Sequence, residues 1–137
     1  MEDLQQLLAP LMRGTVVTIQ LALMSTVFGA VLSFAAGIGK LSGNWLIRAI
    51  SVVYIEIFRG TSLLVQMFWL FFALPLIGIS LDPWVAGVAA LSLNIGAYGA
   101  EVVRGAIQAV PAGQYEAATA ANFTKRSALW AVILRQA

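Results

Sequence analysis

The sequence predicts an all-α membrane protein, a bundle of transmembrane helices, and its composition and charge distribution support this. Of its 137 residues, 61% are hydrophobic and 10% are charged, whereas a soluble domain is typically about 45–50% apolar and about 25% charged. Disordered chains have low hydrophobicity, and a net charge of +2 is too small for a nucleic-acid-binding surface. The composition therefore excludes an ordinary soluble domain, a disordered chain and a nucleic-acid-binding protein.

Charge-free stretches of the chain are long enough to cross a bilayer as helices. The first, 14–39, has 26 residues without a charge; as a helix it rises about 39 Å, against about 30 Å for the hydrocarbon core. The second lies at 60–81, and the third, 83–100, is short enough that its helix should continue past Glu101. We expect an N-terminal segment 1–13 outside the membrane, and then spans at about 14–38, 46–78 and 83–106.

The stretch 41–58 is ambiguous, because it carries Arg48 and Glu56 among mostly apolar residues. It is either a separate helix in the membrane interface or the first half of one long, tilted second span. We favour the long helix, because Gly60-Thr61-Ser62 is a weak break and apolar residues continue through it. The long helix would place Glu56 and Arg59 near membrane depth.

The basic residues predict the orientation of the spans, because cytoplasmic loops carry an excess of Lys and Arg. With the N-terminus outside, seven basic residues lie inside and only Arg13 lies outside. The seven are Lys40, Arg48, Arg59, Arg104, Lys125, Arg126 and Arg135.

Small residues recur at steps of four in two of the predicted spans, and each series makes one flat helix face. Helices in lipid associate through such faces, because apolar area alone no longer drives packing. We therefore expect both faces to pack against other helices. They consist of Ser25, Gly29, Ser33 and Gly37 in the first span, and Ser92, Gly96 and Ala100 in the third.

Polar residues at membrane depth are costly and often functional. Two Glu-x-x-Arg-Gly units, each with a Tyr shortly before it, place opposite charges three residues apart, where they can neutralise one another. They form either a polar path or gate for a solute, or anchors for helix ends at the cytoplasmic interface. Two deeper amides are further cavity candidates. The candidate path or gate residues are Glu56, Arg59, Gln66, Asn94, Tyr98, Glu101 and Arg104.

Catalytic constellations are missing from the sequence. Without Cys or His, it has no thiol or imidazole chemistry and no typical metal-ligand cluster. It also has no glycine-rich phosphate loop. We expect no enzyme activity, no metal and no cofactor on this chain, so any ATP would be bound by another chain.

The segment after the third span predicts two short helices at an angle. Pro111 and Gly113 interrupt the preceding helix, and 115–121 has strong helix propensity. Asn122 can end that helix in the left-handed conformation, and Thr124 can cap a following helix over 125–134. Such a pair would protrude on the cytoplasmic side as a docking element.

The segment resembles the Glu-Ala-Ala loop of the inner-membrane permeases of ATP-binding-cassette importers. In that family Glu-Ala-Ala is followed by three residues, Gly, nine residues and Ile-x-Leu-Pro. Here Glu116-Ala117-Ala118 has the same spacing to Asn122 and to 132–135, with Asn122 replacing Gly and Arg135 replacing Pro. Asn supplies nearly the same turn as Gly, whereas Arg cannot fix the backbone as Pro does.

Three further motifs resemble the polar amino-acid branch of these permeases, and within it the ectoine and hydroxyectoine permeases look most similar. They are Glu56-Ile57-Phe58-Arg59-Gly60-Thr61, the run Asn94–Gly105, and Val110-Pro111-Ala112-Gly113-Gln114.

The resemblance implies the fold and the partners of a type I importer permease (MetI-like). A periplasmic binding protein would deliver the solute, two permease subunits would form the path, and two cassette ATPases would dock from the cytoplasm. The protein would be a multi-pass bacterial inner-membrane protein with residues 1–13 in the periplasm. The coupling loop would be about 108–135, with Gly113, Glu116, Ala117, Ala118 and Asn122 at its turn.

Two other interpretations of the chain stay open at this point. Family members continue with further spans, so we expect this chain to be a fragment or a truncated gene product, which would not transport alone. The second alternative is a small proton-coupled exporter that uses Glu56 or Glu101 as its proton site. The residues predict neither the exact solute nor whether the permease pairs with a copy of itself.

Overall fold

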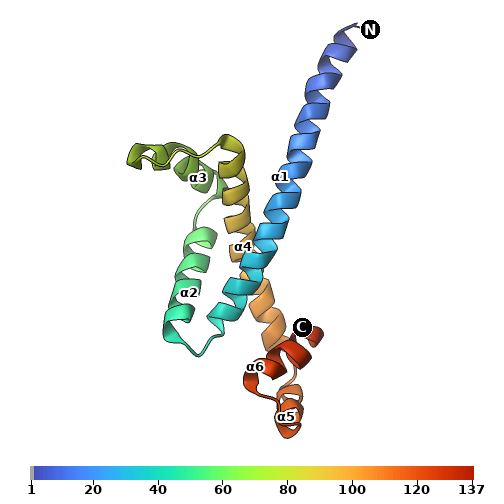
Figure 1. Cartoon of the computed structure of the whole chain (residues 1–137), viewed down its shortest axis with the longest axis vertical. Coiled ribbons are helices and arrows are strands. Elements are labelled where there is room, and N and C mark those ends of the chain that lie inside the picture. Colours follow the sequence, from blue (N-terminus) through green and yellow to red (C-terminus); the bar gives the residue numbers. More distant parts are fainter. Residues whose placement is uncertain (1) are drawn as a thin grey trace.

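The helices α1 and α4 form the centre of the molecule and run side by side in the same direction (Figure 1). The computed structural model describes residues 2–137, with side chains from Leu8 onward. This part of the chain contains helices and turns but no strand. The α-helices are α1 (Glu2–Lys40), α2 (Trp45–Gly60), α3 (Leu63–Phe68), α4 (Pro83–Ala109), α5 (Ala112–Ala120), α6 (Lys125–Ala128) and α7 (Leu134–Gln136).

The two predicted small-residue faces pack against each other, as expected. All of their members are buried. A Cβ atom added to Gly29 would lie 2.6 Å from Ile95 Cγ2, and one added to Gly37 would lie 2.8 Å from the carbonyl oxygen of Ala100. Glycine is therefore required at both points, because α1 and α4 approach too closely for a side chain.

Two helices are long and apolar enough to cross a membrane, Leu8–Lys40 in α1 and Pro83–Ala109 in α4. A third crossing is available only if α2 and the helical segment Leu63–Ile77 count as one bent span. The helix α1 is continuous from Glu2, so it runs without interruption through the predicted segment 1–13. That this segment lies outside the membrane stays a prediction.

The expected continuous helix over 46–78 is wrong. α2 ends at Gly60, α3 begins at Leu63, and the chain bends by 105° between them. Hydrogen bonds explain why the break is strong: Thr61 Oγ1 donates to the carbonyl of Ile57, and Ser62 caps α3 by accepting from the amide of Leu64. Hydroxyl side chains compete with helical backbone hydrogen bonds in this way. α3 consequently lies beside the upper part of α4, at a large angle to α2 (Figure 1).

The helical segment after α3 changes its winding before α4 starts. A π-helical turn, η1 (Trp69–Ala73), leads into a 3₁₀ turn, η2 (Leu74–Ile77), which ends at Gly78 with φ of +87°. Asp82 then starts α4, because its carboxylate accepts from the amide of Trp84 and Pro83 occupies the first helical position.

The C-terminal helices follow the predicted turn chemistry. Asn122 has φ of +63° and ends the turn after α5, and Thr124 Oγ1 accepts from the amide of Ser127 at the start of α6. Both predictions are confirmed. The expected α-helix over 125–134 is interrupted, because a π-helical turn, η3 (Leu129–Ile133), separates α6 from α7.

We expect Gly96→Ala to weaken the packing of α4. A Cβ atom there would lie 2.5 Å from Tyr54 Oη and 2.6 Å from Leu32 Cβ, and overpacking of this kind costs about 1–3 kcal/mol. Thermal unfolding of the detergent-solubilised chain should show a lower midpoint. The matched control is Gly105→Ala in the same helix, where nothing lies within 4 Å; it should leave stability unchanged or raise it by about 0.5–1 kcal/mol. Equal losses in the two variants would contradict the close-packing argument.

Candidate functional site

A polar cluster, which we call the break cluster, joins the bend between α2 and α3 to the middle of α4. It consists of Phe58, Thr61, Gln66 and Asn94. Gln66 Nε2 donates to the carbonyl oxygen of Phe58 (2.8 Å) and to Thr61 Oγ1 (2.9 Å). Asn94 Nδ2 donates to Gln66 Oε1 (3.3 Å) and reaches the Phe58 carbonyl at 3.5 Å. The side-chain amides thus donate hydrogen bonds to backbone carbonyls that have no helical partner at the bend.

Gln66 and Asn94 were predicted as separate deep polar residues, and the structure brings them into contact. Gln66 is 6% exposed, so its amide is held away from the surface. The sequence gives no indication of their contact, because it depends on the 105° bend. Tyr54 was singled out only by its place before Glu56; its hydroxyl donates to the carbonyl oxygen of Leu93 (2.7 Å) and adds a second link between α2 and α4.

Arg59 and Tyr98 form a second pair, at the surface beside the break cluster. The guanidinium carbon of Arg59 lies 5.4 Å from the centroid of the Tyr98 ring, within cation–π range. Tyr98 is three residues before Glu101, which binds Lys40, so the Arg59 guanidinium lies within about one turn of α4 from that ion pair. The assignment of Arg59 to the cytoplasmic side stays a prediction.

The expected neutralisation of Arg59 by Glu56 is wrong. Among the described residues, only Glu101 forms ion pairs, and Glu56 is exposed. The reason is the neighbouring helix, because the guanidinium lies over the Tyr98 ring of α4. On α2, the Glu56 carboxylate therefore has no ion-pair partner within the residues that the structure describes, and the Arg59 guanidinium is stacked on the Tyr98 ring.

The second Glu-x-x-Arg unit forms the expected ion pair and includes a residue that sequence reasoning missed. Glu101 Oε2 accepts from Arg104 (2.8 Å), while Glu101 Oε1 lies 2.5 Å from Lys40 Nζ at the end of α1. Arg104 also donates to Gln108 Oε1 (2.6 Å). The sequence contained one indication of the contact between Lys40 and Glu101. A lysine ends one apolar span and a glutamate lies inside another, and each charge would be costly in a bilayer without a partner.

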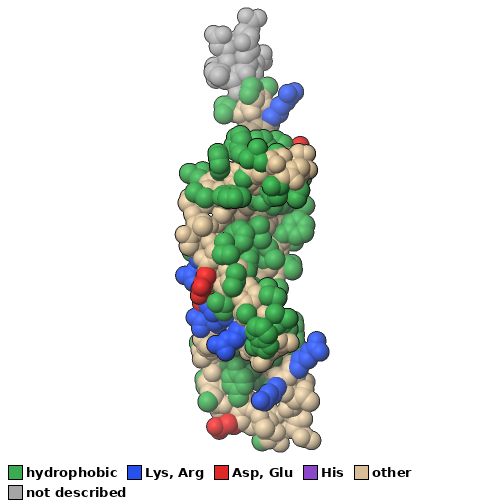
Figure 2. Space-filling model, turned by 90° about the vertical axis from the view of Figure 1, so that its left-hand side faces the viewer, with side chains coloured by type: hydrophobic (Ala, Val, Ile, Leu, Met, Phe, Trp, Pro, Cys, Tyr) green, Lys and Arg blue, Asp and Glu red, His purple; other side chains and the backbone are tan. Residues whose placement is uncertain are grey.

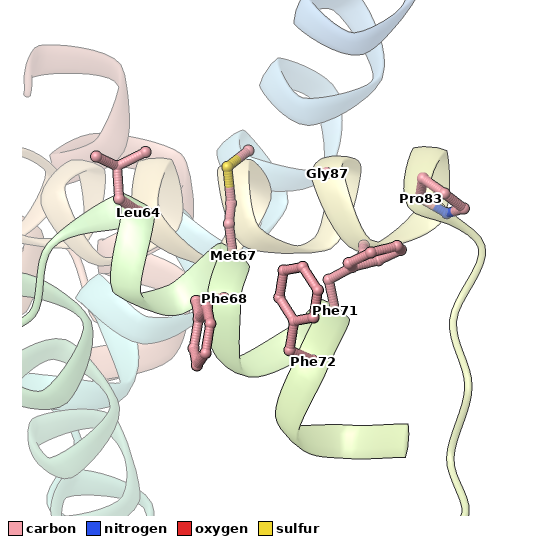
Figure 3. Close-up of a pocket in the computed structure, with 8 residues that line it drawn as sticks. Leu64, Met67, Phe68, Phe71, Phe72, Pro83 and Gly87 are labelled. Carbon is pink, nitrogen blue, oxygen red and sulfur yellow. The ribbon is translucent and has the colours of Figure 1, made fainter. Parts of the chain in front are cut away.

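An apolar hollow lies between the α3–η1 segment and the start of α4. It has a volume of about 370 Å³, and the rings of Phe68, Phe71 and Phe72 lie on one side, with Pro83 and Gly87 on the other (Figure 3). No hydrogen-bonding side chain lines it. It offers no specific recognition for a polar solute.

The predicted docking element protrudes at the lower end of the molecule (Figure 1). Its base is an apolar cluster of Ile107 and Val110 at the end of α4 with Ile133. On α5, the predicted residues Gly113, Glu116 and Ala117 are exposed, whereas Ala118 is buried within the chain; Asn122 supplies the turn.

Charged side chains are unevenly distributed over the surface. On the face drawn in Figure 2, hydrophobic side chains cover much of the middle and upper parts, and most basic side chains lie in the lower half. In the described part of the chain, no three His, Cys, Asp or Glu residues are grouped to hold a metal ion.

Comparison with known proteins identifies the family. Residues 25–137 match the family described as binding-protein-dependent transport system inner membrane component. The chain belongs to this family. The predicted permease family is confirmed.

Curated relatives are permeases for amino acids. The chain is 64% identical to a probable amino-acid ABC transporter permease protein of Sinorhizobium fredii, covering 98% of this chain and 59% of the relative. It is 39% identical to the L-cystine transport system permease protein of Bacillus subtilis, covering 97% of this chain and 57% of the relative. It is 32% identical to the glutamine permease of Escherichia coli, with 90% and 58% covered. The chain thus spans somewhat under three fifths of these relatives.

A solved structure confirms the fold. One chain of a crystal structure of an amino acid ABC transporter with histidines aligns with a TM-score of 0.77 and 32% identity, covering 93% of this chain and 63% of that chain. The predicted all-α importer-permease fold is confirmed. The finer resemblance to ectoine permeases has no support among these relatives, which are named for amino acids, cystine and glutamine.

We expect Gln66→Leu to destabilise the bend between α2 and α3. The substitution keeps the size of the side chain but removes the hydrogen bonds that Gln66 donates to the carbonyls of Phe58 and Thr61. Buried hydrogen bonds between membrane helices contribute about 0.6–2 kcal/mol. Thermal unfolding in detergent should show the loss, and proteolysis should become faster at the bend. Gln20→Leu is the control, because Gln20 is exposed on α1; a similar loss in this variant would contradict the role of the break cluster.

Proposed function

We propose that this chain is part of a permease subunit of an ATP-driven, binding-protein-dependent importer for amino acids or similar compatible solutes. The family match and the named relatives support the transport class. The observation that carries the coupling role is the exposed α5 helix, fixed to the end of an apolar, membrane-length helix. Separate cassette ATPases would hydrolyse ATP, and no cofactor would bind to this chain.

The attachment of α5 supports a mechanical role. Ile107, Val110 and Ile133 bury their side chains together at its base, and the hydroxyl of Tyr115 reaches the carbonyl of Ile107 at 3.5 Å. A displacement of α5 would therefore move the end of α4. Glu116 and Ala117 stay exposed, where an ATPase surface groove could receive them.

The groups around Arg59 support a solute path. Glu56 and Arg59 are exposed, carry opposite charges and lie three residues apart on α2. Arg59 lies over the Tyr98 ring of α4, and Asn94 of α4 contacts Gln66 nearby. An amino acid carries a carboxylate and an ammonium group, so one residue of each sign suits it. Glu101 and Arg104 are joined with Lys40 in ion pairs, and we assign them to holding α1 and α4 together.

The remaining partners follow from the same proposal. A second permease subunit, of the same or a different chain, would complete the path, and a periplasmic binding protein would deliver the solute. The N-terminus would lie on the periplasmic side. The proton-coupled exporter is not favoured, because the family is described as a component of binding-protein-dependent transport systems and Glu101 is already held between two cations.

Charge reversal at Glu116 tests the coupling role. In the transporter assembled with its partners, Glu116→Lys should lower co-purification with the ATPase and lower uptake, because the exposed carboxylate would become a repulsive cation in the contact. Glu56→Gln is the control, since Glu56 is exposed on a different helix, and it should retain the ATPase. Unchanged co-purification of Glu116→Lys would contradict docking through α5.

Arg59→Gln tests the solute path separately. The variant keeps a hydrogen-bonding side chain but loses the charge for a solute carboxylate, which contributes about 1.5–3 kcal/mol in a charged hydrogen bond. Uptake of labelled amino acids should fall about tenfold or more while ATPase binding is kept. Arg48→Gln, another arginine of α2 far from Tyr98 along the helix, serves as control. Equal uptake by wild type and Arg59→Gln would remove Arg59 from the path.

A further inference from the structure

A cavity of about 550 Å³ lies where the turn between α1 and α2 meets the end of α4 and the helices α5 and α6. We call it the interface groove. Its lining combines aliphatic and basic side chains. The aliphatic residues, which we call the apolar wall, are Ile38, Leu41, Ile107 and Leu129, and the basic residues are Lys125 and Arg126.

The charge of the interface groove is uncompensated. No Asp or Glu lines it, and Lys125 and Arg126 are both exposed and form no ion pair in the described part of the chain. Ser42 and Gln108 also line it. This set of cations and hydrogen-bond donors suits a phosphate group.

The groove lies at the level where the two membrane-length helices end. Ile38 and Leu41 flank Lys40, the last residue of α1, and Ile107 lies in the last turn of α4. At this level a bilayer changes from acyl chains to headgroups, and a lining that combines apolar and basic residues suits both. Basic pockets at the ends of transmembrane helices are known binding sites for anionic headgroups.

The position of α5 separates the groove from the proposed ATPase contact. Tyr115 lines the groove and extends its hydroxyl toward the carbonyl of Ile107, so this side of α5 faces α4. Glu116 does not line the groove and is exposed. The groove therefore lies on the membrane side of the docking element, which favours a lipid over a protein as its occupant.

We propose that the interface groove binds an anionic phospholipid, with Lys125 and Arg126 contacting the headgroup phosphate and the apolar wall contacting the first part of the acyl chains. The proposal depends on the membrane position of α1 and α4. It does not depend on ATP-driven import, so the failure of either leaves the other standing.

Native mass spectrometry of the purified full chain tests this proposal with phosphatidylglycerol and phosphatidylcholine of the same acyl composition. We expect wild type to retain phosphatidylglycerol preferentially. Each basic residue near an anionic lipid contributes about 1 kcal/mol, a factor of about five. The double variant Lys125→Gln/Arg126→Gln should therefore bind phosphatidylglycerol about 25-fold more weakly, and Lys125→Arg/Arg126→Lys should keep the affinity.

The matched control is Arg48→Gln/Arg135→Gln, which removes two basic residues that do not line the groove. It should change the affinity less than twofold, and an equal loss in both double variants would overturn the proposal. Displacement of the lipid by millimolar glycerol phosphate would assign the site to a soluble phosphate and also overturn it. The proposal would also be overturned if the Lys125→Gln/Arg126→Gln variant kept its lipid but no longer co-purified with the ATPase. An unchanged thermal midpoint shows that each variant is folded.

Discussion

The close contact between α1 and α4 is the constraint on which the rest of the structure depends. In a bilayer, apolar area does not drive helices together, so they must gain packing contacts at short range. Glycine and serine on both helices make this possible, and the backbone of Ala100 lies too near Gly37 for any side chain between them. Three other helices are attached to this pair: α2 through Tyr54, α3 through Asn94, and α5 through Ile107.

The parts of the fold that the sequence predicts well are those set by local or periodic chemistry. Small residues at steps of four predicted the faces of α1 and α4, and Asn122 and Thr124 predicted the turn between α5 and α6. The continuous run of apolar residues predicted one long helix where the chain bends between α2 and α3. The bend depends on hydrogen bonds of the Thr61 and Ser62 hydroxyls, which a pattern of apolar residues does not reveal. Contacts between distant charges, such as that of Lys40 with Glu101, depend on which helices become neighbours.

The candidate residues separate into groups with different physical roles. Glu101 is surrounded by cations and joins two helices, whereas Glu56 faces outward without an ion pair. The two Glu-x-x-Arg units are identical in sequence pattern, and their difference arises from the neighbour of each arginine. Arg59 meets an aromatic ring, and Arg104 meets a carboxylate that Lys40 also binds. A repeated motif therefore does not imply a repeated function.

The tight packing of Gly96 has a mechanical consequence. This residue lies at the midpoint of α4 (Pro83–Ala109) and is contacted by Leu32 of α1 and Tyr54 of α2. A tilt of α4 about this contact would move its two ends in opposite directions. For half of a helix of this length, roughly 20 Å, a tilt of about 5° displaces each end by roughly 1.7 Å. Asn94, close to the fulcrum, would hardly move, while the aromatic hollow beside Pro83 would widen or narrow as α5 is pushed.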